Sequence, residues 1–569
     1  MTRANRATAV MKRRLPIGAF VCRVETIVGL GLGLLLAVLI LLPVATVALG
    51  ALHDTSGTSL RPLLEVLGST RIILNTLLVG TGTTVCSVTL GALLAVVLVR
   101  LDTPGRGLLA RLVPMPLYLT PLLTAIAWSW LGSPRGGLIN LAGRQLLGID
   151  RLIDLNGAGG VIFVASLAYV PLPFLLIGAA LRAMDPSLEE SARVHGASPW
   201  AALRRITLPL VLPATLGSAL LVFVQAMGLF SVPAVLGMPG GFQVAGTEIY
   251  RLLNNYPPRV GQAAAWGLLL LAATAGLVAL QAALLGRRSF VTVTGKAFRP
   301  RVIAVRRGRA LLALLAWAYV FAAVVLPVAT LVWAALVNFI TVDPHLMTFG
   351  LSHFRYVLFE YPKTYLAFEN SLVLGVATAS AACLIGLGVG WIVIRTRSPA
   401  RVFLDQVSMV PLAMPSMVLA LGLLWLYVNL KALPIYGTIG ILLLAYVTHA
   451  LPFAVRAASG ALRQLHGELE DAARMAGAGW GQMLRWITLP LTRPTLIATW
   501  GLLFILALQE VSSSILLYTS RTTVLSVAVF DLWEAGNVNA VAALGVLQLI
   551  VIFLALLIVV RARNQEVAA

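Results

Sequence analysis

One acidic residue, Glu510, falls within a long apolar stretch that is able to cross a membrane. Gln225 occupies the corresponding stretch in the first half of the chain, and Ser512 follows Glu510 by two positions. Ionisable groups within a bilayer are costly and usually face a cavity or a partner. We therefore predict that these side chains line a pathway, in which Glu510 attracts a cation and repels an anion. The alternative is that Glu510 is protonated or bonded to nearby serines and only holds helices together.

Clustered groups for catalysis or metal binding are not indicated elsewhere in the sequence. Cys22, Cys86 and Cys383 lie far apart, so neither a disulfide framework nor a thiolate metal site follows from them. Gly295-Lys296 lacks both the upstream glycine and the following serine or threonine of an ATP-binding P-loop. The six histidines form no metal-ligand spacing. We predict no catalytic, cofactor or metal site in this chain.

A polar segment between apolar stretches occurs twice, with a constant separation of 281 positions. The matching residues are Glu189, Ala192, Gly196, Ala197 and Pro209 in the first copy and Glu470, Ala473, Gly477, Ala478 and Pro490 in the second. Glu190 of the first copy is matched by Asp471. Two unrelated helices rarely agree at so many positions, so the chain contains an internal repeat.

Each copy has the composition of a short capped helix, a turn and a second helix. Ser187 and Glu190 fit a capping box, in which their side chains bond to free amides of the first turn. Gly196 and Gly477 permit the positive φ angle that ends such a helix. Pro209 fits the first turn of the next helix, where a missing amide costs least.

This pattern resembles the cytoplasmic EAA loop of ATP-binding-cassette (ABC) importer permeases, with loops at about 185–209 and 466–490. Ser191 and Asp471 depart mildly from the family motif. The resemblance implies that the loops contact ATPase subunits through Glu189, Glu190, Ala192, Gly196, Ala197, Glu470, Asp471, Ala473, Gly477 and Ala478. An ordinary surface helical hairpin is the alternative.

Composition and charge indicate a membrane protein. The chain is 59% hydrophobic and 11% charged, with a mean hydropathy of +0.93, which excludes a soluble globular domain. A net charge of +21 would suggest nucleic acid as the partner of a soluble chain. Here essentially all the excess positive charge falls on one side of the predicted spans, as expected of a cytoplasmic face. We predict cytoplasmic N- and C-termini, a lipid bilayer as surroundings and no nucleic-acid partner.

Apolar stretches of sufficient length predict twelve membrane-spanning helices. They lie at about 27–52, 72–99, 108–132, 159–181, 209–236 and 262–286, and at about 310–336, 368–394, 402–428, 437–461, 490–518 and 538–560. The first stretch could be a cleaved signal peptide. It is longer than a signal sequence requires, however, and its Leu42-Pro43 recurs in the second half as Leu326-Pro327. We expect it to be retained.

The predicted fold is an all-α integral membrane protein of two parallel six-helix repeats, like a type I ABC importer permease. The first repeat covers 1–290, a basic cytoplasmic linker covers 291–309, and the second repeat covers 310–569. Parallel repeats place a pathway at their interface. The outer loops at about 133–158 and 337–367 could dock a separate binding protein, or merely cap the bundle.

Among fused importer permeases the sequence is most similar to the ferric-iron type, in the segments 247–258 and 523–536. This resemblance implies a bacterial inner-membrane importer of ferric iron that works with two copies of an ABC ATPase, which binds ATP and Mg, and with a periplasmic substrate-binding protein. Thiamine, phosphonates and polyamines are alternative substrates. A dedicated ferric site would need clustered oxygen ligands. The sequence shows no such cluster, so metal-ligand chemistry gives iron no independent support. Alternatives from other classes are an ion-coupled secondary transporter and a structural or assembly protein.

Overall fold

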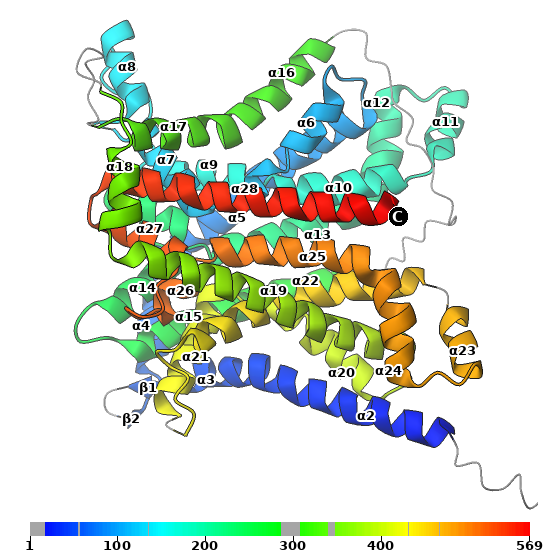
Figure 1. Ribbon diagram of the computed structural model, residues 1–569. Helices are drawn as coiled ribbons and strands as arrows, with labels where there is room; N and C mark the ends of the chain where they lie inside the picture. Colours follow the sequence, from blue (N-terminus) through cyan, green and yellow to red (C-terminus); the bar gives the residue numbers. More distant parts are fainter. Residues whose placement is uncertain are drawn as a thin grey trace, which may run out of the picture.

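The computed structural model describes residues 17–54, 57–134, 136–285, 308–338, 348–430, 432–465 and 467–568. Most of the predicted basic linker at 291–309 lies outside these residues, as do residues 1–16. The described chain is a bundle of helices with one short hairpin, formed by β1 (His53–Asp54) and β2 (Gly57–Thr58) (Figure 1). The predicted all-α membrane fold is confirmed.

Nine helices in the described ranges are long and apolar enough to cross a membrane. Those of the first half are α2 (Ile17–Leu36) with α3 (Leu42–Gly50), α5 (Thr70–Ala95), α13 (Leu208–Met227) and α15 (Val260–Leu285). Those of the second half are α16 (Arg309–Val320) with α17 (Leu326–Leu336), α19 (Lys363–Arg395), α22 (Ile439–Gln464), α25 (Leu489–Gln509) and α28 (Val538–Ala568). Three further pairs of helices are bent, and the total reaches the predicted twelve if each pair is one span.

The bent pairs coincide with the predicted spans at 108–132, 159–181 and 402–428, each of which is divided into two helices. Their helices are α6 (Arg106–Leu112) with α7 (Pro121–Gly132), α20 (Ala400–Val407) with α21 (Ser416–Asn429), and α9 (Ala158–Tyr169) with α10 (Pro171–Ala183). The bends measure 97°, 107° and 41° in that order. Pro116 and Pro411 occupy equivalent short 3-10 turns just before the two larger bends. Proline lacks an amide hydrogen and clashes with the preceding turn, so it ends or kinks a helix.

Wide π-helical turns come directly before Leu-Pro pairs at equivalent positions of the two halves. These turns are η2 (Ala37–Leu41), η8 (Phe321–Val325), η5 (Leu203–Thr207) and η12 (Leu484–Thr488). Because proline cannot donate to the carbonyl one turn earlier, the regular hydrogen-bond ladder is interrupted there. The helix nevertheless continues, so each repeated loop runs without a break into the span that follows it.

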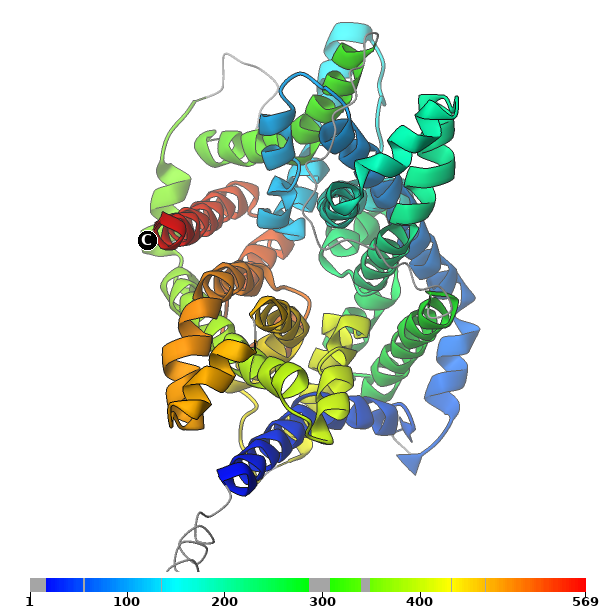
Figure 2. The ribbon, with the colours of Figure 1, turned by 90° about the vertical axis from the view of Figure 1, so that its right-hand side faces the viewer.

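The first span of each half packs against the other half. The helices α2 and α3 lie beside α20 and α21, and α17 lies beside α7 (Figures 1 and 2). Thr46 Oγ1 donates a hydrogen bond to the Gly422 carbonyl over 2.9 Å, and Tyr319 Oη donates to the Leu167 carbonyl over 3.0 Å. The sequence repeats are therefore not two separate bodies, because their first spans are exchanged.

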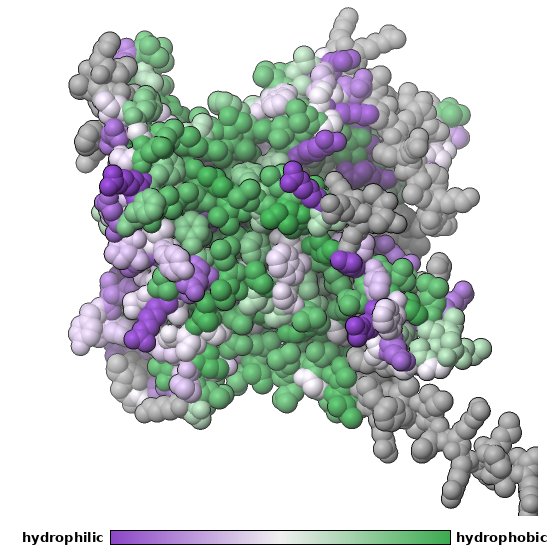
Figure 3. Space-filling view, viewed as in Figure 1, coloured by the Kyte–Doolittle hydropathy of each residue, from purple (hydrophilic) through white to green (hydrophobic). Residues whose placement is uncertain are grey.

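The surface of the bundle matches a bilayer. Apolar side chains cover the middle of the helices, while polar side chains gather at the two ends (Figure 3). Both repeated loops lie at one end, which we call the loop end (Figure 1). Seen from the loop end, one loop lies on each side of the bundle centre, as expected of parallel repeats (Figure 2).

Candidate functional site

A cavity of about 600 Å³ lies between the two halves. Gln225 at the end of α13 contributes to it from the first half. Glu510 and Ser512 contribute from the segment that follows α25 in the second half. The three polar side chains singled out from the sequence thus face one cavity. Their part in transport stays a prediction.

Glu510 ends the helix α25 instead of lying within it. Its backbone is extended, with φ −70° and ψ 117°, so the predicted span at 490–518 is too long and ends at Gln509. The Glu510 carboxylate accepts a hydrogen bond from the Ser513 amide over 2.9 Å, which holds the side chain at the cavity wall. The Glu510 carbonyl accepts from the hydroxyl of Ser526 over 2.6 Å. Serines therefore do fix this residue, through its backbone as well as its carboxylate.

His449 and Tyr446 of α22 are cavity residues that the sequence analysis missed. The Nε2 atom of His449 lies 3.5 Å from Ser416 Oγ, and its Nδ1 atom is buried without a hydrogen-bond partner among the described residues. Tyr446 Oη lies 2.6 Å from Ser514 Oγ. Their spacing of three positions within an apolar helix is the signal that could have placed them on one face.

The two repeated loops have the same fold, which is the predicted short helix, turn and second helix. They contain α11 (Pro186–Val194) with α12 (Pro199–Ala202), and α23 (Glu468–Met475) with α24 (Trp480–Met483). Gly196 has a φ of 83° and Gly477 a φ of 88°, so the predicted left-handed turns are confirmed. In the first loop the amide of Ala197 donates to the carbonyl of Ala192 over 3.0 Å, and Ala478 does the same to Ala473. An open hollow of about 700 Å³ next to the first loop includes Ala192, Gly196 and Ala197 in its wall.

The predicted capping box at Ser187 and Glu190 is wrong. The helix α11 begins at Pro186, and Asp185 caps it by accepting a hydrogen bond from the Ser187 amide over 2.9 Å. Proline suits this first helical position because its missing amide would have no partner there. In the second loop the amides of Glu470 and Asp471 both donate to the Gly467 carbonyl over 3.0 Å.

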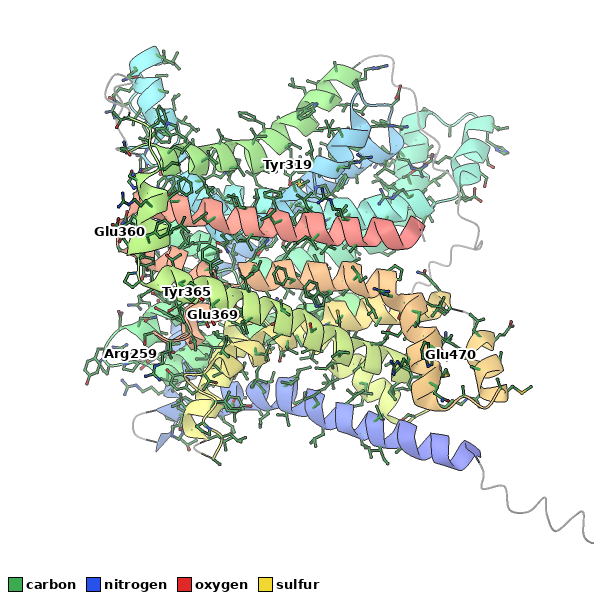
Figure 4. All side chains as sticks on the ribbon, viewed as in Figure 1. Arg259, Tyr319, Glu360, Tyr365, Glu369 and Glu470 are labelled. Carbon is green, nitrogen blue, oxygen red and sulfur yellow. The ribbon has the colours of Figure 1, made fainter. Side chains whose placement is uncertain are left out.

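The neighbouring acids of the loops point in different directions. Glu470 is buried, with 5% of its surface exposed, whereas Asp471 is exposed. Figure 4 marks Glu470 at the loop end, opposite Glu360 and Glu369. Glu189 of the first loop also points toward the helix bundle, where its carboxylate lies 3.4 Å from the guanidinium of Arg100. The side chain of Glu190 lies outside the described residues.

The end opposite the loops is closed by aromatic rings from both halves. They lie on or beside the equivalent helices α14 (Ala245–Asn254) and α27 (Leu525–Glu534). The ring centres of Phe230 and Phe530 are 5.4 Å apart, and the ring of Tyr250 lies 5.9 Å from that of Phe530. Leu229 and Ser231, on either side of Phe230, line the cavity, so the rings separate it from this end of the bundle.

The carboxylate of Glu534 and the hydroxyl of Tyr518, at this closed end, lie near the negative charge of Asp531. Burial raises the pKa of Glu534, and the charge of Asp531 adds to this effect, while a hydrogen bond from Tyr250 opposes it. Burial, followed by the charge of Asp531, raises the pKa of Tyr518 to about 12. Lys363 Nζ lies 2.7 Å from Asp531 and partly balances the acidic charge.

A bundle of membrane-spanning helices from two repeats, with a cavity between them and paired loops at one end, defines an integral membrane permease. The sequence profile of the binding-protein-dependent transport system inner membrane component matches residues 87–289 and 382–567. The chain belongs to this family and contains its domain twice.

Relatives with known names agree with this family. A putative ferric transport system permease protein of Haemophilus influenzae is 29% identical over 65% of this chain and 58% of its own length. The aligned part is thus less than two thirds of that relative. A probable ABC transporter permease protein of Sinorhizobium fredii is 29% identical over 80% of this chain and 81% of its own. An Fe(3+)-transport system permease protein of Haemophilus influenzae is 23% identical over 87% of this chain and 91% of its own.

Proposed function

We propose that this chain is the permease of an ATP-driven importer and that ferric iron crosses the membrane through the cavity between its halves. The observation that carries this proposal is the cavity itself, which both halves line and which holds Glu510. A carboxylate surrounded by apolar side chains and hydroxyl groups favours a cation over an anion. Two relatives named for ferric transport support iron as that cation.

The paired loops are the proposed contact with the ATPase. Two equivalent loops fit two copies of one partner, and the hollow beside Gly196 offers room for an inserted side chain or helix. ATP and Mg would be bound by that partner. The loop end and both termini would then be cytoplasmic in the bacterial inner membrane, in agreement with the distribution of positive charge.

The proposed contact with a periplasmic binding protein is the opposite end of the bundle. Helices α8 (Leu138–Leu147) and α18 (Ser352–Arg355) both lie at that end of the bundle (Figure 1). A loaded binding protein would release its cargo above the aromatic closure. Closure of the ATPase pair would then move the loops and open the cavity to that side.

The charge of each alternative substrate decides whether the Glu510 carboxylate would attract or repel it. A phosphonate is an anion and would be repelled by Glu510, whereas thiamine and polyamines are cations and would not. The names of the relatives favour iron over these two cations. An ion-coupled secondary transporter would need no partner at the loops. It would take its energy from an ion gradient instead of ATP, and this difference distinguishes it from the proposed importer.

The test is uptake into liposomes that contain the chain, its ATPase and its binding protein. ATP-dependent uptake of ferric iron is expected, and Glu510→Gln should lower it by about tenfold or more because the charge is lost while the shape is kept. Glu369→Gln is the matched control, since Glu369 is exposed on α19 and lies outside the cavity lining. Uptake driven by a proton gradient without ATP would contradict the proposal. Unchanged iron uptake in Glu510→Gln would contradict the role of the cavity charge.

A further inference from the structure

Each repeated loop is attached to the end of a membrane span by an arginine and a glutamate. In the second half, Arg395 Nε lies 3.2 Å from Glu470 Oε1, and both side chains are largely withdrawn from solvent. In the first half, Arg100 Nη2 lies 3.4 Å from Glu189 Oε1, and Arg100 is only 2% exposed. Both arginines stand at the loop end of the second span of their half. The arrangement is therefore a repeated feature and not an accident of one side chain.

The same carboxylates also bind the start of the next span. Thr207 Oγ1 donates to Glu189 over 2.6 Å, and Thr488 Oγ1 donates to Glu470 over 3.3 Å. These threonines end the π-helical turns η5 and η12, directly before α13 and α25. Each glutamate thus joins three elements, namely its loop helix, the end of one span and the beginning of another. We call each such group of arginine, glutamate and threonine a brace.

The brace of the second half reaches further into the bundle. Arg395 Nη2 donates to the carbonyl of Leu465, directly after α22, over 2.8 Å. The helix α19, which ends at Arg395, carries Thr378 in the cavity wall, and α22 carries His449 there. A displacement of Glu470 therefore reaches two helices that form the cavity.

We infer that the two braces transmit movement of the repeated loops to the cavity and that Glu189 and Glu470 are positioning residues that do not bind the ATPase. Separating the partners of a buried ion pair leaves a charge without compensation, which is strongly unfavourable. Each loop therefore moves together with the ends of its spans. The inference rests on the proposed function, because it names the route by which the ATPase acts on the cavity.

The two braces differ in how completely they are satisfied. The Nε and Nη1 atoms of Arg100 are buried without hydrogen-bond partners within the described residues, whereas Arg395 bonds both a carboxylate and a carbonyl. An unsatisfied buried guanidinium favours a rearrangement that supplies acceptors. The first brace is thus the one expected to tighten when the loops move, and the second is already tight.

The test compares Glu470→Gln with its exposed neighbour, Asp471→Lys, in the complex of chain, ATPase and binding protein. Glu470→Gln should keep the ATPase bound, while stimulation of hydrolysis by the loaded binding protein falls by about tenfold. Asp471→Lys should instead lose the ATPase during purification. The exchange of charges in Arg395→Glu with Glu470→Arg should restore part of the stimulation.

Two outcomes would overturn the inference. One is loss of the bound ATPase in a folded Glu470→Gln variant, which would place Glu470 in the contact. The other is full stimulation in that variant. If Glu470→Gln does not fold, Thr488→Val and Arg395→Lys give the answer, because each weakens the brace without leaving a buried charge unpaired. Failure of the wild-type complex to bind an ATPase at all would instead refute the proposed function.

Discussion

The hydroxyl of Tyr250 in the first half donates a hydrogen bond to the carboxylate of Glu534 in the second half over 3.1 Å. This bond crosses the interface beside the tilted rings of Phe230 and Phe530, at the end away from the loops. Because the two residues belong to equivalent helices, the bond holds together the parts that must separate if the cavity is to open on this side. It is therefore a direct point at which to test the closure.

Tyr250→Phe should make the closed end open more readily. The change keeps the ring contacts and removes one hydrogen bond, which contributes about 1 kcal/mol. Spin labels at the exposed positions Asn255 and Ala535, in a background without the native cysteines, would report the distance between the halves. A larger population of long distances is expected. The same distribution as in the parent protein would show that the rings alone keep this end closed.

The stability of the protein should depend on pH through Glu534. Its pKa is raised in the folded state, chiefly by burial, so the folded protein holds this proton more tightly than the unfolded chain. Stability from this group is therefore full at low pH and is lost as the pH rises from the ordinary value for glutamate through the raised value. The melting temperature of Glu534→Gln relative to the parent should increase over this range. Glu369→Gln is the control for the loss of one carboxylate. A difference in melting temperature between Glu534→Gln and the parent that stays constant with pH would contradict the expectation.

The turns at Gly196 and Gly477 should depend on backbone conformation and not on space. A Cβ atom at either position would meet nothing within 4 Å, but φ lies in the left-handed region. Valine at either position should cost about 1–3 kcal/mol locally and reduce ATP-dependent uptake by misplacing the loop. Asparagine tolerates this conformation and should leave uptake near normal. Equal uptake in both variants would mean that the turn can adopt another conformation without loss of coupling.

The packing of α3, in the exchanged first span, against α21 should depend on the close contact at Gly422. A Cβ atom there would lie 2.4 Å from the carbonyl oxygen of Pro43, so Gly422→Ala must push α3 away from α21. Overpacking of this kind costs about 1–3 kcal/mol and should lower the melting temperature in detergent. Gly31→Ala is the control, because its Cβ would meet nothing within 4 Å. Similar melting of both variants would argue against a tight exchanged contact.

Local sequence patterns were sufficient for several parts of the structure. The glycines that end the loop helices and the twofold repetition could be predicted because they depend on the conformation of a few adjacent residues. The apolar stretches predicted the membrane spans for the same reason. Their ends were less certain, and α25 stops at Gln509 because Glu510 bonds to the serines after it.

The tertiary structure decided the features that join distant residues. Glu189 and Glu190 are adjacent acids of the same helix, and only the position of Arg100 shows that Glu189 faces the bundle. The exchange of the first spans depends on contacts such as that between Thr46 and Gly422, which lie 376 positions apart. His449 joins Glu510 in one cavity because separate spans come together there. Local pattern describes the conformation of a segment, whereas the partner of a buried polar group is set by where the whole chain folds.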